Sequence, residues 1–350
     1  MELHDIDAPG HEQVLRVEDA GSGLVGFIAI HSTWAGPAVG GLRMRPYGSE
    51  QEALTDVLRL SRGMTYKNAA AGLPLGGGKA VILGDPATAK TPTLLSAFGR
   101  ALATLGGRYW TAEDMGMTPA DMAIIARETE FVAGLPGGRP FASGDPSPVT
   151  ARGIFNAIRT TARHRFGSAE LTGRHVALQG LGHVGAHLGA LLHAAGARLT
   201  VADIDPARVA RARADWGAEA ATPEGILTVE ADILAPCAIG AILNAGTIPA
   251  LRVAAVAGGA NNQLATPEDG RRLHARGILY APDYVANAGG IINVATEVLR
   301  IEDRAEWVAG KLEALDATLD RILTRAAAEG AGPDAMADAT VEAQMSQSAA

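Results

Sequence analysis

Apolar side chains recur at helical spacing in the segment that follows Ser49. Ser49 and Glu52 form the pair of a capping box, which is typical of a helix start. One stripe of this helix then carries Val57, Leu60, Met64 and Lys67. The pattern predicts a helix that places a lysine on its inward side or just beyond its end.

Short apolar stretches alternate with helical patterns in the second part of the chain. The strand-like stretches begin at Val176, Leu199, Ala231, Val253 and Ile278. Helical patterns follow the first two of them. Alternation of this kind is typical of a parallel, doubly wound sheet. The sequence therefore predicts an α/β fold with a Rossmann-type second part.

A loop rich in Gly, Pro and Ser, residues 137–148, separates this part from the first, which mixes β-branched stretches with amphipathic helices. Loops of this composition are typical of domain boundaries, so we expect a hinge here. The predicted domains are residues 1–145 and residues 146–324. We expect the tail, residues 325–350, to pack back on the first domain.

The composition of the 350-residue chain excludes several classes of protein. It holds 30 Lys and Arg against 38 Asp and Glu, a net charge of −8, which argues against a nucleic-acid partner or an anionic membrane surface. Its one cysteine, Cys237, leaves no internal disulfide or Cys-based metal cluster, and no metal site is predicted. No secretory signal or membrane-spanning stretch is recognised, so we expect a cytoplasmic protein. The 43 glycines indicate turns and close approaches to ligands.

A glycine motif lies in the context of a nucleotide-binding turn. Gly180, Gly182 and Gly185 fit the spacing GxGxxG, directly after a strand-like stretch and at the start of a helical pattern. Such glycines permit a tight turn and let a pyrophosphate approach the helix N-terminus. The next strand ends in Asp203, whose carboxylate would bind an adenosine ribose and repel the extra phosphate of NADP, so NAD is favoured. Asp205 is predicted to cap the next helix. The alternative is a glycine turn in an unrelated α/β sheet.

Two lysines of the first part are candidates for a catalytic base. Lys67 continues the apolar stripe of the predicted helix, and Lys79 follows three glycines, where we expect a sharp turn that lets a substrate approach. The segment is not a P-loop, because Ala80 stands where Ser or Thr is required. Partial desolvation would lower the pKa of such a lysine and let it act as a base near neutral pH. Each lysine alone is more typical of a surface position, but Asp114 adds a carboxylate that could shuttle protons.

Seven segments carry a family resemblance. They are GPAVGGLRM (36–44), GMTYKNAAAGLPLGGGK (63–79), TAEDMG (111–116), GLGHVG (180–185), APCAIG (235–240), GGANNQL (258–264) and ILYAPDYVANAGG (278–290). In this unbroken order they resemble the NAD-dependent amino-acid dehydrogenases, a family that comprises leucine, valine, phenylalanine and glutamate dehydrogenases. The resemblance covers about residues 10–299.

The resemblance implies a role for each matching residue. Lys67 would hold the substrate α-carboxylate, Lys79 would be the general base that activates water, and Asp114 would exchange protons with the amine. Asn262 would contact substrate or nicotinamide, with a loop-capping amide as the alternative, and Thr150 would lie near the nicotinamide carboxamide. The implied reaction is the reversible oxidative deamination of an amino acid to a 2-oxo acid, ammonia and NADH. It would take place in the cleft between a first, substrate-binding domain and the NAD-binding domain.

The resemblance also maps a side-chain pocket. Its positions are Val39, Ala112, Ile291 and Val294, and the substrate-side pair Gly40 and Gly41 follows Val39. Glutamate dehydrogenases carry a lysine where Val39 stands, and a buried glutamate carboxylate without that cation would be costly. Four aliphatic side chains favour leucine, isoleucine or valine, although one methyl group supplies only about 1–3 kcal/mol of discrimination. Phenylalanine enzymes tend to have glycine in place of Ala112.

Two alternatives stay open at this level. A phenylalanine or broad-specificity aromatic amino-acid dehydrogenase would share the catalytic set. A non-catalytic NAD-binding sensor would share the fold, but it has no need of a desolvated base beside a carboxylate, so Lys67, Lys79 and Asp114 argue against it. The family forms assemblies, and we expect a homo-oligomer. Its size stays open, because the Ala-rich tail after Gly330 departs from the family.

Overall fold

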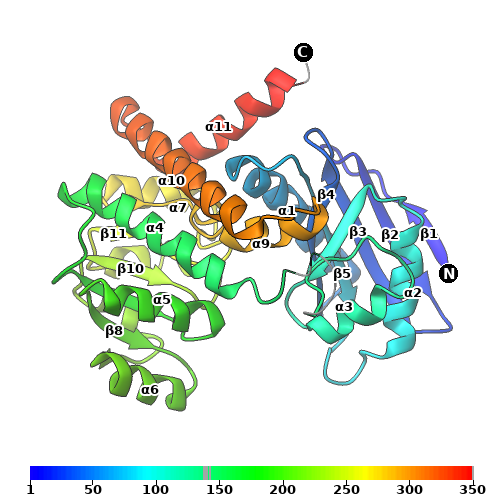
Figure 1. Cartoon of the computed structure of the whole chain (residues 1–350), viewed down its shortest axis with the longest axis horizontal. Helices are drawn as coiled ribbons and strands as arrows, with labels where there is room; N and C mark the ends of the chain where they lie inside the picture. The colour runs from blue at the N-terminus through cyan, green and yellow to red at the C-terminus, as the bar shows by residue number, and fades with distance from the viewer. Residues whose placement is uncertain (137–140, 142, 349–350) are drawn as a thin grey trace. The chain divides into compact units, whose positions relative to one another are not determined.

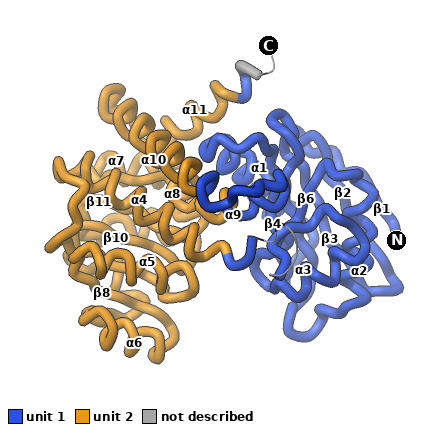
Figure 2. The backbone as a smooth tube through the Cα atoms, viewed as in Figure 1, with its two compact units in different colours: residues 1–145, 293–308, 345–350 blue, residues 146–292, 309–344 orange. Residues whose placement is uncertain are grey.

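Two compact units make up the chain. The computed structural model describes residues 1–136, 141 and 143–348. Unit 1 consists of residues 1–145 and 293–308 with a terminal piece from Met345, and unit 2 consists of residues 146–292 and 309–344 (Figure 2). Of the loop expected to be a hinge, residues 137–140 and 142 lie outside the described residues. No helix of the described chain is long and apolar enough to span a lipid bilayer.

The sheet of unit 1 is mixed. Its strand order is β1-β2-β3-β5-β4-β6, antiparallel from β1 to β5 and parallel from β5 to β6. The strands are β1 (Glu2–Asp5), β2 (Gln13–Asp19), β3 (Leu24–Ser32), β4 (Ala38–Arg45), β5 (Gly76–Leu83) and β6 (Tyr109–Glu113). Because β4, β5 and β6 run parallel, their carboxyl ends lie at the same edge of the sheet.

Helices cover both faces of this sheet (Figure 1). They are α1 (Glu50–Ala70), α2 (Pro92–Ala103) and α3 (Pro119–Ile125). Phe27 packs with Val57 of α1, whereas its neighbour Ile28 packs in a second core with Phe98 of α2, because successive strand residues point to opposite faces. The helix predicted after Ser49 is confirmed: the Ser49 side chain accepts a hydrogen bond from the backbone N–H of Glu52 at 3.1 Å.

The sheet of unit 2 is parallel throughout, in the order β12-β11-β10-β7-β8-β9. Its strands are β7 (His175–Gln179), β8 (Arg198–Ala202), β9 (Glu219–Ala220), β10 (Ile233–Pro236), β11 (Ala255–Val256) and β12 (Leu279–Tyr280). The chain starts at the central β7, runs outward to β9 and crosses back to β10, which is the order of a Rossmann-type sheet. The predicted α/β class and doubly wound sheet are confirmed.

The helices from residue 147 onward lie wholly or partly in unit 2. They are α4 (Ser147–Phe166), α5 (His183–Ala194), α6 (Pro206–Trp216), η1 (Gly225–Thr228), η2 (Ile248–Ala250), α7 (Pro267–Ala275), α8 (Asp283–Ala286), α9 (Gly289–Val298), α10 (Arg304–Glu329) and α11 (Pro333–Ser348). The division between the units falls inside α9, between residues 292 and 293, and again inside α10, between residues 308 and 309.

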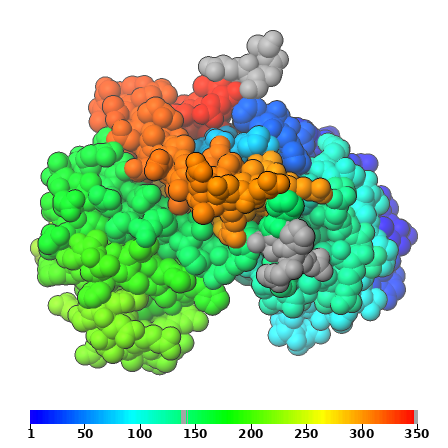
Figure 3. Space-filling model, in the orientation of Figure 1, coloured from blue at the N-terminus to red at the C-terminus, as the bar shows by residue number. Residues whose placement is uncertain are grey.

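The last helices of the chain lie mainly in unit 2. In Figure 3, α10 (orange) runs along the surface of α4 (green). His164 of α4 pairs with Asp320 of α10 at 2.7 Å. Tyr284 donates a hydrogen bond to Asp338 of α11 at 2.9 Å. Residues 309–344 therefore belong to unit 2, and the terminal piece from Met345 belongs to unit 1. The expected packing of residues 325–350 on the first domain stays a prediction.

The segment 293–308 returns to unit 1, where Glu297 anchors it. The Glu297 side chain is 8% exposed and accepts hydrogen bonds from the backbone N–H groups of Gly134 and Ser143, the latter at 2.9 Å. Burial raises the pKa of the Glu297 carboxyl, although these backbone donors act in the opposite direction. Glu297 of α9 thus binds the backbone at two positions near the end of the first stretch of unit 1, Gly134 and Ser143.

Candidate active site

The strand β5 carries Lys79 into the interior of unit 1. Lys79 lies opposite Ala29 of the neighbouring β3 and is only 6% exposed. Its Nζ lies 2.5 Å from Oδ2 of Asp114, which directly follows β6. β4 lies between these two strands in the sheet. The structure therefore brings together two of the predicted catalytic residues as an ion pair, in which Lys79 is buried and Asp114 is partly exposed.

The glycines before Lys79 form a strand and not a turn. Gly76, Gly77 and Gly78 all belong to β5, and none of them has a left-handed backbone. A Cβ on Gly77 would lie 2.0 Å from the backbone N of Thr65 in α1. The run therefore lets α1 pack closely on β5. The predicted sharp turn is wrong, because three glycines serve close helix packing as well as they serve turns.

The predicted substrate-side glycines lie in β4, beside the ion pair. A Cβ on Gly41 would lie 2.8 Å from Cβ of Asp114, and one on Gly40 would lie 1.9 Å from the carbonyl oxygen of Gly78. Gly41 is paired with Ala112 of β6 and lies in the strand between Lys79 and Asp114. The missing side chain at Gly41 thus leaves the space that Asp114 occupies.

Asp114 is held as an anion by two cations. Burial raises the pKa of its carboxyl, but the nearby charges of Lys79 and then Arg43 lower it more, to about 2. Arg43 Nε donates a hydrogen bond to Asp114 Oδ2 at 3.3 Å. Arg43 was not predicted from the sequence. Its only signal was its position two residues after Gly41 in the same strand.

The remaining predicted residues of unit 1 lie on the elements around this pair. Lys67 lies in the last turn of α1, partly buried, two residues after the Thr65 that packs on Gly77. Val39 is fully buried in β4, and Ala112 is 6% exposed in β6. Val294 is 8% exposed and lies on the part of α9 that belongs to unit 1.

The glycine motif of unit 2 forms the turn between β7 and α5. Gly180 has a left-handed backbone with φ of +91°, and Gly182 is the N-cap residue of α5. A Cβ on Gly185 would lie 2.0 Å from the carbonyl oxygen of Gly180, so only glycine lets the helix start so close to the turn. The turn therefore has the compact form that a pyrophosphate requires at a helix N-terminus.

Asp203 stabilises this turn as well as lying beside it. Its Oδ2 accepts a hydrogen bond from the backbone N–H of Leu181 at 2.6 Å, and its Oδ1 accepts one from Asp205 N–H at 2.9 Å. The sequence pointed to a ribose-binding carboxylate here but not to this second role. Asp205 accepts a hydrogen bond from Ala207 N–H at 2.9 Å as the N-cap of α6, so its predicted capping role is confirmed.

A cavity of about 700 Å³ opens beside the turn. Gly180, Gly182 and Asp203 line it, together with the exposed side chains of Ile204 and Ile239, which are 89% and 64% exposed. Apolar side chains with few polar groups are typical of nucleotide pockets. The residues present therefore fit a dinucleotide.

Cys237 also lines this cavity. Burial raises the pKa of its thiol to about 12, so the thiol stays neutral.

The other predicted residues of unit 2 lie on α4, on a loop and on α9. The Thr150 hydroxyl donates a hydrogen bond to the carbonyl of Pro146 at 2.9 Å, and a Cβ on Gly290 would lie 2.7 Å from its Oγ1. Asn262 has a left-handed backbone, with φ of +52°. Ile291 is 8% exposed and follows Gly290 in α9. The structure thus groups Thr150 with the start of α9 and the glycine turn with Asp203.

Two stretches of the chain match known sequence families. Residues 11–131 match the family described as Glu/Leu/Phe/Val dehydrogenase, dimerisation domain. Residues 204–345 match the Glutamate/Leucine/Phenylalanine/Valine dehydrogenase family. The chain belongs to this dehydrogenase family. It is therefore an amino-acid dehydrogenase, an oxidoreductase of a family that uses pyridine nucleotides, and the predicted resemblance is confirmed.

Proteins of known name are similar to this dehydrogenase over most of its length. A leucine dehydrogenase from Geobacillus stearothermophilus is 54% identical over 85% of this chain and 80% of its own. A valine dehydrogenase from Streptomyces virginiae is 47% identical over 98% of this chain and 96% of its own. The crystal structure of L-tryptophan dehydrogenase from Nostoc punctiforme is 40% identical, covers 97% of each chain and superposes with a TM-score of 0.83.

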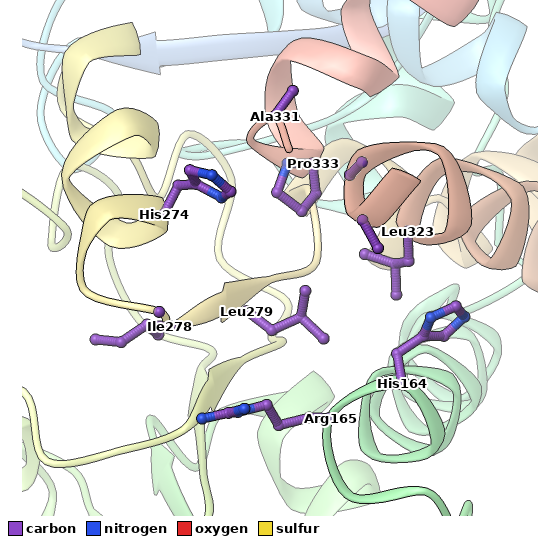
Figure 4. Close-up of a pocket in the computed structure, with 11 residues that line it drawn as sticks. His164, Arg165, His274, Ile278, Leu279, Leu323, Ala331 and Pro333 are labelled. Carbon is purple, nitrogen blue, oxygen red and sulfur yellow. The ribbon is translucent and has the colours of Figure 1, made fainter. Parts of the chain in front are cut away.

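The dehydrogenase has a second cavity in unit 2, of about 250 Å³, which holds none of the predicted residues (Figure 4). Two histidines and an arginine of its lining lie in the last turns of helices: His164 and Arg165 in α4, and His274 in α7. Basic side chains are favoured there by the partial negative charge of a helix C-terminus. His164 also lies 2.7 Å from Asp320. The helix ends therefore explain these basic residues without a ligand. Among the described residues, no group of His, Cys, Asp or Glu is placed to hold a metal ion.

Proposed function

We propose that this dehydrogenase catalyses the reversible oxidative deamination of leucine and other branched-chain L-amino acids, with NAD as its cofactor. The observation that carries the proposal is the ion pair of the buried Lys79 with Asp114, whose Nζ and Oδ2 lie 2.5 Å apart. A lysine and a carboxylate in one site supply the proton acceptor and the proton carrier that deamination needs. Relatives named leucine and valine dehydrogenases support the branched-chain substrate.

The residues of unit 1 carry out the proton transfers. Lys67 binds the substrate α-carboxylate and orients the α-carbon. Lys79, in its neutral form, takes a proton from the water that adds to the iminium carbon. Asp114 accepts and returns the proton of the amine while ammonia leaves. The products are a 2-oxo acid, an ammonium ion, reduced cofactor and a proton, and the low exposure of Lys79, 6%, limits the access of bulk water to these steps.

The cofactor would be held by unit 2. Gly180, Gly182 and Gly185 would cradle the pyrophosphate, and Thr150 and Asn262 would lie at the nicotinamide end. When bound, the nicotinamide ring accepts the hydride that leaves the substrate α-carbon.

Asp203 supports NAD over NADP. Its carboxylate lines the cavity and would accept hydrogen bonds from ribose hydroxyls, whereas it would repel a phosphate. Arg208, which could bind a phosphate, also lines the cavity, but its guanidinium lies 3.7 Å from Asp203 Oδ1 and 3.3 Å from Asp205 Oδ2. Two carboxylates therefore already balance this cation.

The side chains at the four substrate positions that the family resemblance maps support a branched-chain substrate. Val39, Ala112, Ile291 and Val294 are all aliphatic, and all are at most 8% exposed. A glutamate carboxylate bound beside Val39, where glutamate dehydrogenases carry a lysine, would lack a cation. An aromatic substrate is the second candidate, because the L-tryptophan dehydrogenase of Nostoc punctiforme is 40% identical.

A substrate panel tests the proposal. NADH production should be fastest with leucine, valine or isoleucine, slower with phenylalanine and tryptophan, and slowest with glutamate, and NAD should outperform NADP. Replacing Lys79 by Ala should lower kcat by roughly 10²- to 10⁴-fold, because a general base is lost, while NADH binding by fluorescence is retained. The matched variant Lys311→Ala, in α10 of unit 2, should keep full activity. Inactivity of the unaltered enzyme with every amino acid would contradict the proposal.

We also propose that the enzyme is a homo-oligomer assembled through unit 1. The match of residues 11–131 to a dimerisation domain supports this arrangement. The chain mass is 35.9 kDa, so light scattering that gives a multiple of this mass would agree with it.

A further inference from the structure

One cation of unit 1 contacts the Lys79–Asp114 pair without a role in the proposed reaction. The Arg43 side chain is 14% exposed and extends from β4. Its Nε lies 3.3 Å from Asp114 Oδ2, the same oxygen that lies 2.5 Å from Lys79 Nζ. A single carboxylate oxygen therefore faces two cations.

Arg43 is also fixed from its other side. Its Nη1 donates a hydrogen bond to Asp56 Oδ2 at 3.1 Å. Tyr47 donates to the same oxygen at 2.8 Å, and Asp56 is itself anchored on α1. Because both ends of the guanidinium are bound, Arg43 cannot swing away from Asp114 without breaking a second partly buried ion pair.

Charged and titratable groups lie on every element that packs beside β5. β4 carries Arg43 and Arg45, α1 carries Asp56 and Lys67, β6 carries Tyr109 and Glu113, and β3 carries His31. Tyr109 and His31 are neutral near pH 7, because burial raises the pKa of the tyrosine and lowers that of the histidine to about 4. The fixed cation in direct contact with Asp114, besides Lys79 itself, is Arg43.

A base must lose its proton before it can accept one, and Asp114 works against that loss at Lys79. An adjacent anion stabilises the protonated amine, whereas a second cation destabilises it. A guanidinium stays charged at all working pH values. Arg43 therefore offsets the anion while Lys79 releases its proton, and it remains as a partner for Asp114 afterwards.

We propose that Arg43 is a positioning residue of the reaction, which holds the Asp114 carboxylate in place beside Lys79 and lowers the pH at which Lys79 becomes a base. This inference rests on the proposed role of Lys79.

The test is the pH profile of kcat/KM for leucine oxidation by the whole enzyme. The rising, acidic limb reports the loss of the Lys79 proton. Arg43→Gln removes a positive charge, so Lys79 keeps its proton longer and the limb should move to higher pH, by roughly 1–3 units. Arg43→Lys keeps the charge and should return the limb toward its original position. Titration of the substrate amine is common to all variants and does not alter the differences between them.

Two further variants separate charge from packing. Arg45→Gln removes the same charge from the same strand, but Arg45 pairs with Glu52 at 2.8 Å and with Asp56 at 4.0 Å and not with Asp114, so the limb should move less than in Arg43→Gln. Asp56→Asn removes a negative charge beside Arg43, so the limb should move to lower pH. A merely structural role would loosen the site in both Arg43→Gln and Asp56→Asn and would not shift the limb in opposite directions.

An active enzyme whose limb is unmoved in Arg43→Gln, or is moved as far by Arg45→Gln, would overturn the inference. If Arg43→Gln does not fold, an unmoved limb in Asp56→Asn overturns it, and a limb moved to lower pH supports it. Inactivity of the unaltered enzyme with every amino acid contradicts the proposed function instead, so the two failures are distinguishable.

Discussion

The site of unit 1 depends on an absent side chain as much as on the charged ones. Gly41 lies in the strand between Lys79 and Asp114, and a Cβ there would come 2.8 Å from Cβ of Asp114. Carbon atoms do not approach so closely without displacement. The geometry of the ion pair is therefore set by a residue that contributes no functional group.

Replacing Gly41 by Ala should move Asp114 away from Lys79 and lower kcat by roughly 10- to 100-fold, because small misplacements of reacting groups are costly. Steady-state kinetics with leucine would measure the effect, and NADH binding to unit 2 should be unchanged. Gly63→Ala is the matched control, since a Cβ there meets nothing within 4 Å and Gly63 lies inside α1. It should leave kcat unchanged and stabilise the protein by about 0.5–1 kcal/mol. Full activity in Gly41→Ala would contradict the argument.

A site residue can be predicted from the sequence when it lies in a recognisable local motif. Lys79 and Asp114 could be found from their motifs, and the structure places them together. Arg43 could not, because an arginine in an apolar strand gives no sign of its partners, and Asp56 is brought to it only by the packing of α1 on the sheet. The sequence of a glycine run such as residues 76–78 likewise does not show whether the run forms a turn or packs under a helix.

At the scale of elements, the turn between β7 and α5 separates two uses of glycine. Gly185 is needed by the protein itself, because a Cβ there would lie 2.0 Å from the Gly180 carbonyl. Gly182 has open space around the position of a Cβ and an ordinary φ of −64°, so the fold does not require glycine there. Its purpose is best explained by the approach of a ligand.

Gly182→Ala and Gly185→Ala should therefore fail in different ways. Gly182→Ala should unfold at the original temperature but bind NADH at least about tenfold more weakly, because a methyl group occupies the approach of the pyrophosphate. Gly185→Ala should lose about 1–3 kcal/mol of unfolding free energy from overpacking. Thermal unfolding and fluorescence titration with NADH would measure both. Unchanged NADH affinity in Gly182→Ala would show that the turn does not bind the cofactor.

Elements with strong local signals were predictable, whereas their partners were not. The capped helix after Ser49 and the alternation of strands and helices after residue 148 can be predicted from short segments of sequence. The unit to which the tail belongs cannot be predicted in this way, because α11 is Ala-rich and weakly amphipathic. Its place in unit 2 follows from single contacts such as that of Tyr284 with Asp338, which no periodicity reveals.

At the scale of the whole molecule, unit 1 is built from separated stretches of the chain. The first stretch ends at Asp145, and residues 293–308 return to it through Glu297. This carboxylate receives the N–H groups of Gly134 and Ser143. Unit 1 therefore depends on a segment that the chain supplies only after residues 146–292, the larger part of unit 2, have been made.

Glu297→Gln should destabilise unit 1 by about 1–3 kcal/mol, because the amide offers one acceptor for two buried N–H donors. Urea unfolding followed by tryptophan fluorescence would measure the loss, since Trp34 and Trp110 lie in unit 1. Glu302→Gln, on an exposed position of the same segment, should change stability by less than about 0.5 kcal/mol. Equal stability of the two variants would contradict the anchoring role of Glu297.

The position of α9 limits how this enzyme could exchange parts with a relative. The division between the units falls inside that helix, with Ile291 on one side and Val294 on the other. A hybrid joined once, after Asp145, would take from its donor the nucleotide turn and also Val294 and Glu297. Its cofactor preference and its substrate preference would then change together. Under the roles proposed for these residues, independent inheritance of the two traits would require a second joint between Asn262 and Ile291, so a single crossover would transmit them as a linked pair.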